Sequence, residues 1–506
     1  MVKNTAPPKS ANDPYNEIRK MQNQIQALEN EKKKDYEALS GTHIALANAF
    51  KDVEDWIKGE ESANNAIKTA KKIKDNLTKN LKIAEATEAI GTIYVTIQDY
   101  QKGLKYWSEA LDLLDKNFEA LLKDKPKMPE DQFTQQTTLT KSLYIDYLKQ
   151  RISTLLKLKD EKHAKEAISK PFSKFLKTKD PNCFEILMFL SDIKIDLALQ
   201  LKDTDEIVRS VSELLILDFF AKKYSGDSRY WSKKFHHDIK EKCSFLIDTL
   251  KIALDEKVIG KETLNIMKLI NLETKDHMYI DKILEIKQSD DFQNKILEIN
   301  ALITKMRQDD ASPLVLSMVQ NELISTIAQQ NQYTEAFEKA KEIMKDIKKI
   351  KNKEVKDFLL GQTQLNLFRI NVRRQDYKQA EKEGRKCIEY FEENIKTLGH
   401  ACIGILELAS CYIIQRRFDK AESLLERPID FCEEMGSAEL LARLYELLGG
   451  VGLKSADSNK AAIYFAASAI FYLISNDQNK YQEFLTLSIN MYNRYLESIG
   501  FPTVEM

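Results

Sequence analysis

Apolar residues recur along most of the chain at intervals of three and four, which is the spacing of one face of an α-helix. The first such stretch follows Tyr15 and consists of Ile18, Met21, Ile25 and Leu28. It covers fewer than two heptads, whereas a stable coiled coil usually needs about three or four. We therefore expect a single helix, which either caps the helices that follow it or serves as a short dimerisation or partner helix.

Aromatic and small residues then recur as pairs three positions apart. Trp56 precedes Gly59, and Tyr100 precedes Gly103 at an offset of 44 residues. In the second half the offsets are 44, 41 and 40 residues, and the pairs are Tyr333 with Ala336, Tyr377 with Ala380, Phe418 with Ala421, and Ser458 with Ala461. This pattern is clearest over residues 36–120 and 310–475, and it predicts an internal repeat.

Helix-pair geometry explains this spacing. An aromatic residue at the elbow fills the base between two antiparallel helices, and a small residue three positions later lets the second helix cross the first closely. A second small residue in the first helix supplies the matching dent, for which Ala47, Gly91, Ala409 and Gly449 are candidates. Each pair leaves an apolar face open, so pairs must stack. The expected fold is an all-α, helix-turn-helix solenoid.

These residues resemble tetratricopeptide repeats. The clearest match runs from Ile90, Gly91 and Tyr94 through the elbow at 99–103 to Ala110, and 375–380 and 417–421 resemble two further elbows. The family period is 34 residues, so the longer offsets resemble the long-helix variant of kinesin light chains, Leu-Gly-Asn repeat adaptors and axonemal tetratricopeptide proteins. The resemblance implies a superhelix whose first helices line a concave, partner-binding surface. Ser458 and Pro428 depart from the family pattern.

The pattern divides the chain into five segments. These are a flexible tail (1–14), an N-terminal helix with tetratricopeptide-like repeats (15–125), an irregular helical middle with degenerate repeats (126–309), C-terminal tetratricopeptide-like repeats (310–477), and a capping helix with a tail (478–506). In the middle segment, Glu161 stands at the aromatic position of a degenerate elbow, and 185–201 and 204–220 are expected to form an antiparallel pair. Pro313 is expected to begin a helix, since proline suits a first turn.

The amino-acid composition restricts the kinds of turn, partner and cellular location that we expect. Glycine and proline number only 15 and 10 among 506 residues, so we expect few turns that need a positive φ. Lys and Arg (77) balance Asp and Glu (78), which gives no overall attraction to nucleic acid or acidic membranes. No apolar run approaches a membrane span, and the N-terminus has no signal-peptide core. The six cysteines form no CxxC pair, which favours reduced thiols and a cytoplasmic location.

Catalytic chemistry finds no support in the sequence. The motifs of nucleotide-binding loops, serine hydrolases and zinc proteases are absent. His236, His237 and Cys243 are the nearest approach to a metal cluster, but their spacing places His237 and Cys243 on different helix faces. The basic and aromatic stretch 222–237 suits either an amphipathic helix or a contact with nucleic acid or an acidic tail. We expect no catalytic, cofactor-binding or metal-binding residues, and no enzyme activity.

The family resemblance suggests one binding mode that the residues disfavour. Chaperone-binding members hold a C-terminal carboxylate with a clamp of Lys and Asn. Asn48 occupies the first Asn position, but Ile44 stands at the position of the partnering Lys one turn earlier. The next repeat has Ala89 in place of the second Asn. The third helix offers Asp146 and Gln150 in place of Lys and Arg. An apolar side chain cannot donate to a carboxylate and an acid repels it, so no chaperone-tail clamp is expected.

The C-terminal repeats offer a different surface. Helix periodicity places Asn366, Arg369 and Arg373 on one face, with Asn321 and Arg443 on the corresponding faces of neighbouring helices. These five residues are the candidate partner-binding site, because Arg forms forked contacts with acidic side chains. The alternative is a solvated polar face with local ion pairs.

Two functions follow from the resemblance. The first is a non-catalytic scaffold in a multiprotein assembly, with neighbouring subunits as partners and microtubule structures such as the ciliary axoneme as the setting. The second is a soluble adaptor that binds an extended peptide or helix of a cargo or regulatory protein.

Overall fold

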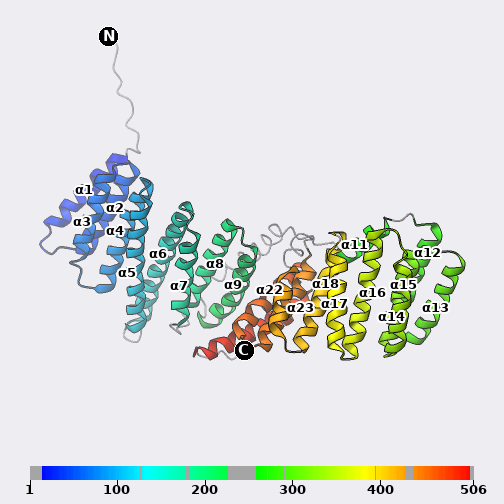
Figure 1. Ribbon diagram of the computed structural model, residues 1–506. Coiled ribbons are helices and arrows are strands. Elements are labelled where there is room, and N and C mark those ends of the chain that lie inside the picture. Colours follow the sequence, from blue (N-terminus) through cyan, green and yellow to red (C-terminus); the bar gives the residue numbers. More distant parts are fainter. Residues whose placement is uncertain are drawn as a thin grey trace, which may run out of the picture. The chain divides into compact units, whose positions relative to one another are not determined.

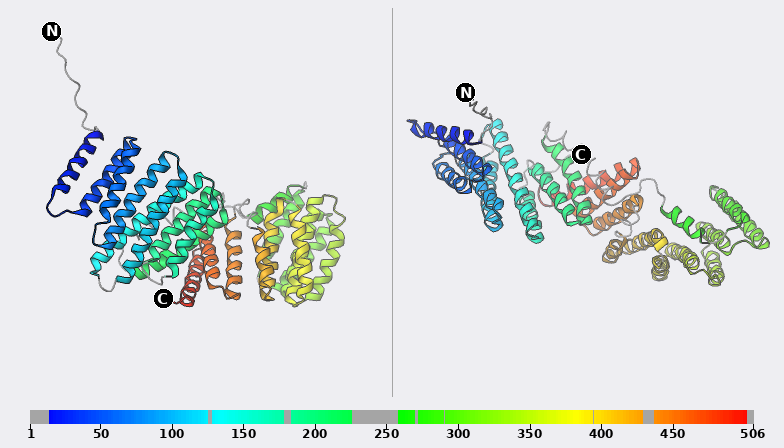
Figure 2. Two further views of the ribbon diagram at one scale, coloured as in Figure 1. Left: turned by 60° about the vertical axis from the view of Figure 1, so that its left-hand side comes forward. Right: turned by 90° about the horizontal axis from the view of Figure 1, so that it is seen from above.

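The computed structural model describes residues 14–124, 128–177, 183–225, 258–269, 272–289, 291–393, 395–428 and 437–501. Over these residues it is all-helical and contains no strand, which confirms the predicted fold class (Figures 1 and 2). Three predictions fall wholly or mostly outside this part of the chain, namely the N-terminal tail, the basic and aromatic stretch 222–237, and the group of His236, His237 and Cys243. No described helix is long and apolar enough to cross a membrane.

The chain divides into two compact units, Met1–Leu201 and Lys202–Met506. This boundary follows spatial contact, whereas the five segments derived from the sequence follow the repeat pattern and remain a prediction. Helices cover 185–201 and 204–220, as expected, but they belong to different units. Their antiparallel pairing also remains a prediction.

The first unit is a stack of helices in chain order (Figure 1). The helices are α1 (Pro14–Asn30), α2 (Tyr36–Asp52), α3 (Trp56–Ala70), α4 (Asn76–Thr96), α5 (Tyr100–Asp124), α6 (Glu130–Lys157), α7 (Glu161–Lys177) and α8 (Phe184–Leu201). Ile18 and Ile25 of α1 are buried in one cluster with Leu39, Leu46 and Phe50 of α2. The first predicted helix therefore caps the helix that follows it.

The second unit contains a longer stack. Its helices are α9 (Thr204–Ser225), α11 (Val258–Met267), α12 (Thr274–Lys287), α13 (Phe292–Gln308), α14 (Pro313–Gln329), α15 (Tyr333–Ile347), α16 (Lys353–Arg373), α17 (Tyr377–Glu392), the short η3 (Ile395–Thr397), α18 (Leu398–Ile414), α19 (Phe418–Glu426), α21 (Ala438–Lys454), α22 (Ser458–Ile474) and α23 (Gln478–Ser498). The helix starts at Pro313 and Gln478 match the sequence prediction.

Two of these helices, α9 and α11, pack against helices that come much later in the chain. The green α9 lies against α22 and α23 (Figures 1 and 2), and α11 lies against α16, α18 and η3. Glu262 of α11 caps α18, because its carboxylate accepts the N–H groups of Gly399 and His400 at 2.6 and 3.1 Å. The ring Nδ1 of His400 lies 2.6 Å from the same carboxylate. The covered helices can therefore be apolar on every side, as α22 is.

The elbows behave as the repeat pattern predicts. The first residues of the second helices are Trp56, Tyr100, Tyr333, Tyr377, Phe418 and Ser458. Each of these is half-buried, whereas the small residue three positions later is buried in every case. Glu161 likewise begins α7, and Ala164 is fully buried, which confirms the degenerate elbow. The small residues are therefore enclosed within the packed helices, as the repeat pattern requires.

The turns contradict one expectation drawn from composition. Among the residues that the structure describes, ten non-glycine residues have a positive φ, namely Glu54, Gln98, Lys159, Lys202, Asp310, Asn331, Gln375, Arg416, Ala456 and Asn476. The prediction that such turns are few was therefore wrong. Gln98 shows why the conformation is tolerated. The N–H of Gln98 donates to Val95 and that of Asp99 to Tyr94, at 3.1 and 2.8 Å, which is the Schellman pattern.

The residue after the positive φ often begins the next helix as its cap. Asp55, Asp376 and Asp457 each accept a backbone N–H with the side chain. A left-handed residue other than glycine costs roughly 1–2 kcal/mol. A helix cap contributes about 1 kcal/mol, so these caps offset much of that cost.

Neighbouring glycines of α21 test the close crossing. A Cβ at Gly452 would lie 2.7 Å from the backbone N of Ala461, whereas a Cβ at Gly450 would meet nothing within 4 Å. We expect Gly452→Ala to lower stability by about 1–3 kcal/mol through overpacking. Gly450→Ala should raise it by up to about 1 kcal/mol through helix propensity. Chemical unfolding of both variants measures the difference, and equal effects would contradict the close crossing.

Candidate partner-binding site

The first helices of successive pairs in the second unit present matching residues. Counting back from the positive-φ residue of each elbow gives four positions with a 4-3-4 spacing, which place their side chains on one helix face. We call these positions the first-helix stripe: Met318, Glu322, Ser325 and Gln329 of α14; Gln362, Asn366, Arg369 and Arg373 of α16; Ile403, Glu407, Ser410 and Ile414 of α18; and Arg443, Leu447, Gly450 and Lys454 of α21. All except Asn366 are at least partly exposed.

These stripes lie side by side. Helix α14 contacts α16, and α18 contacts α21. Arg369 of α16 joins α18 by donating Nε to both carboxylate oxygens of Glu407, at 3.1 and 2.9 Å, and Nη2 also bonds to Glu407. The four first helices therefore form one continuous surface.

The structure brings four of the five predicted residues onto this stripe. Asn321 lies one position away from it and is buried. Asn366 donates Nδ2 to the backbone and side-chain oxygens of Asn321 at 3.2 and 3.1 Å, so both amides are used inside the protein. Arg373 donates Nη1 to the carbonyl of Ala328 at 2.9 Å. Arg443 is half-buried at the first stripe position of α21. Contact of these residues with a partner remains a prediction.

Charge along the stripe is unevenly compensated. Glu322 pairs with Lys287 of α12 at 2.8 Å, and Glu407 pairs with Arg369. Within the described part of the chain, Arg373, Arg443 and Lys454 show no ion pair with a carboxylate. The stripe therefore carries an excess of positive charge next to half-buried or exposed apolar residues such as Met318, Ile403 and Ile414.

Sequence reasoning missed Glu407, Lys454 and Ile414. A usable signal was present, because each of them lies at a fixed distance before an elbow. Phe418 marks the elbow after Glu407 and Ile414, and the small residue Ala461 marks the elbow after Lys454.

The first unit differs at the equivalent positions. There the residues include the acids Asp52, Glu85 and Asp146 and the cation Lys157, and Asn48 accepts a bond from Lys51. Glu85 is paired with Lys82 at 2.9 Å, whereas Asp52 and Asp146 show no ion pair among the described residues. These acids would repel a carboxylate.

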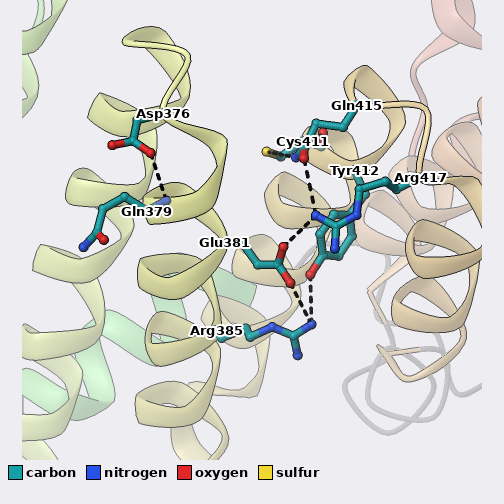
Figure 3. A network of polar contacts seen from close by, with 8 residues as sticks. All are labelled: Asp376, Gln379, Glu381, Arg385, Cys411, Tyr412, Gln415 and Arg417. Atoms are coloured by element: carbon teal, nitrogen blue, oxygen red, sulfur yellow. Dashed lines mark hydrogen bonds and ion pairs between the residues drawn. The ribbon is translucent and has the colours of Figure 1, made fainter.

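A polar network beside the stripe holds α17, α18 and α19 together (Figure 3). Glu381 of α17 accepts Nη1 of Arg417 at 2.6 Å and Nη2 of Arg385 at 3.2 Å. Arg385 also donates to the hydroxyl of Tyr412 at 3.0 Å. The guanidinium of Arg417 lies over the ring of Tyr412, 4.7 Å from its centroid. Residues 27 to 36 positions apart are thus joined at one elbow.

This network changes the acidity of Glu381. Burial raises the pKa of the carboxyl group, but hydrogen bonds from Arg417, Tyr412 and Arg385 lower it by more. The resulting pKa is about 2, against the ordinary value of 4.5. The carboxylate is therefore ionised at neutral pH and stabilises the folded form.

Metal-ligating and charged side chains of the described residues are distributed as follows. No group of three or more His, Cys, Asp or Glu side chains among these residues could hold a metal ion. A polar pocket between α5, α6 and α7 does hold several charged groups. In it Lys174 pairs with Asp115, and Lys170 pairs with Glu166. His163 also lines the pocket, and its ring Nδ1 lies 2.8 Å from Asp160, which does not line it. Within each of the two lysine–carboxylate pairs the charges compensate each other, which suits structural roles.

Acid titration should reveal the contribution of Glu381. Because its pKa is lowered on folding, the stabilisation is fully present above pH 4.5 and is lost as pH falls towards about 2. The stability difference between the unmodified chain and Glu381→Gln should therefore shrink over this range. The exposed Glu389 lies on the same helix, and Glu389→Gln is the control, with a small effect at every pH. Urea unfolding at a series of pH values measures both, and a pH-independent difference for Glu381→Gln would contradict the assignment.

Comparison with known proteins gives only distant likenesses. No protein-family model matches the sequence, and no curated protein matches it. Among solved structures, BtubC from P. vanneervenii is 12% identical, with a TM-score of 0.33 over 43% of this chain and 96% of that one. A tetratricopeptide repeat protein from Parabacteroides merdae is 13% identical, with a TM-score of 0.25 over 80% and 99%. The apo quorum sensor NprR from B. thuringiensis is 16% identical, with a TM-score of 0.28 over 78% and 99%. At these values the likenesses carry no argument, and the repeat fold rests on the helix pairs and elbows of this chain.

Proposed function

We propose that this chain is a non-catalytic scaffold that binds protein partners through the first-helix stripe of its second unit. The observation that carries the proposal is the register of α14, α16, α18 and α21, whose exposed positions align and carry uncompensated positive charge. A continuous surface of this kind suits an extended peptide or a helix. Its length spans four first helices, which is more than a small-molecule site requires.

The chemistry of the stripe indicates the chemistry of the partner. Arg373, Arg443 and Lys454 favour acidic side chains, because charge-assisted hydrogen bonds to carboxylates are stronger than neutral ones. Ile403 and Ile414 lie on α18 between these cations and favour apolar side chains in the same partner. The partner is therefore a segment in which acidic and apolar residues are interspersed.

The internal bonds refine the roles of the predicted residues. Arg369 is engaged with Glu407, so a partner carboxylate would have to compete with an existing ion pair. Arg373 uses one N–H on Ala328 and has further donors on an exposed guanidinium. That bond fixes the side chain in advance and reduces the entropy lost on binding. Arg373 and Arg443 are therefore the principal contacts, and Asn321 and Asn366 support the helices beneath them.

Charge reversal tests the stripe. The double variant Arg373→Glu with Arg443→Glu should reduce partner capture from lysate of the source cells by about tenfold or more, which is about 1.4 kcal/mol. The matched control is Arg374→Glu with Lys420→Glu, which changes the same charge at exposed positions off the stripe. Circular dichroism establishes that both variants are folded. The same captured proteins at the same yield in both variants would contradict the proposal.

The proposal also concerns the assembly to which the scaffold belongs. The long repeat period resembles that of motor-associated and axonemal proteins, which favours a large and long-lived microtubule-based assembly. The alternative is a soluble adaptor that binds one peptide transiently. In both cases the chain binds its partner through the first-helix stripe. The two cases differ in the stability and lifetime of the complex.

Extraction of cells separates the two settings. A subunit of a cytoskeletal assembly should stay with the insoluble fraction in detergent and leave it only at high salt, because many charged contacts hold it. An adaptor should appear in the detergent-soluble fraction at low salt. Immunoblotting of the fractions decides between them, and full release at low salt would contradict the assembly setting.

A further inference from the structure

The pair of α12 and α13 forms one end of the stack in the second unit (Figure 1). Each interior pair is covered on both sides, whereas α12 and α13 have neighbours in α14 on one side only among the described helices. On the other side their side chains line a groove of about 490 Å³, which includes Met278 and Lys282 of α12 and Glu298, Ala301, Leu302 and Lys305 of α13.

Apolar side chains are exposed at this end. Met278 is 60% exposed, and Leu297, which precedes Glu298 on α13, is 68% exposed. A solenoid needs a polar outer face on its terminal repeat to remain soluble as a monomer. An apolar groove at an open end is instead a surface that another helix can cover.

The charged residues of α13 indicate which kind of helix can cover the groove. Glu298 and Lys305 both line the groove and are seven residues, or about 10 Å, apart along the helix. They are therefore too far apart to pair with each other. Glu298 accepts a bond from Asn294 at 2.6 Å, and Lys305 shows no ion pair within the described part of the chain. Ala301 and Leu302 lie midway between the two charges.

The order of these two charges along α13 is complementary to the same order in a second, antiparallel copy of α13. If two copies of α13 lie antiparallel with Ala301 near a two-fold axis, Glu298 of each copy lies opposite Lys305 of the other. The small side chain of Ala301 permits a close approach at the axis. A two-fold contact requires a self-complementary patch of this kind.

We propose that a second copy of this chain covers the groove, so that the second units of two molecules join through α12 and α13. Glu298 and Lys305 form two equivalent ion pairs across the axis, and the apolar side chains around Met278 are buried between them. The dimer presents two first-helix stripes, which would strengthen binding to a partner that carries repeated segments.

Charge exchange tests this arrangement on the full chain by sedimentation equilibrium. Glu298→Lys places two lysines opposite each other at both contacts, and Lys305→Glu places two carboxylates there. Each single variant should weaken self-association by about tenfold or more. An equimolar mixture of the two should restore it, because every contact then joins opposite charges. The double variant Glu298→Lys with Lys305→Glu should also self-associate.

Glu342→Lys is the matched control, since Glu342 is a 67% exposed glutamate on α15 away from the groove. It should associate as the unmodified chain does. Three results would overturn the proposal: an unmodified chain that is monomeric at about 100 µM, well above the Kd of a specific interface; single variants that associate normally; or a mixture that fails to recover. A monomer would leave a different protein as the occupant of the groove.

Discussion

The close crossing of the two helices in each pair is the contact on which the rest of this structure depends. At Gly103 an added Cβ would lie 3.1 Å from the carbonyl oxygen of Gly91, and at Gly59 it would lie 3.3 Å from that of Ala47. Such distances are tighter than ordinary van der Waals contact, so a larger side chain at the crossing would force neighbouring atoms to shift. The crossing therefore fixes where each second helix lies against its first. Stacking of the pairs then buries the apolar faces that remain.

The same helix crossing in every pair also explains why the first-helix stripe forms. Because each elbow begins at the same place relative to the crossing, side chains at a given distance before the elbow face the same way in every pair. This alignment produces the first-helix stripe of α14, α16, α18 and α21. The network around Glu381 then locks one elbow to its neighbours (Figure 3). Local sequence rules thus generate a surface that extends over several repeats.

The sequence predicted those features that depend on local spacing. Trp56 and Tyr377 marked helix starts correctly, because an aromatic residue and a small residue three positions later suffice to identify an elbow. It did not predict the positive φ of Gln98 or Arg416, since backbone hydrogen bonds, and not glycine, stabilise those turns. It also did not predict the ion pair of Arg369 with Glu407, whose partners are 38 residues apart. Long-range contacts of this kind, and the packing of α9 and α11, require the folded structure.

Hydrogen exchange measured with and without a captured partner tests the central claim, that the first helices form the binding surface. Amide protons become protected where a partner covers a helix or suppresses its local opening. The account predicts added protection in α14, α16, α18 and α21, with the second helices α15, α17 and α19 little changed. Protection confined to the second helices, or to the first unit, would contradict it.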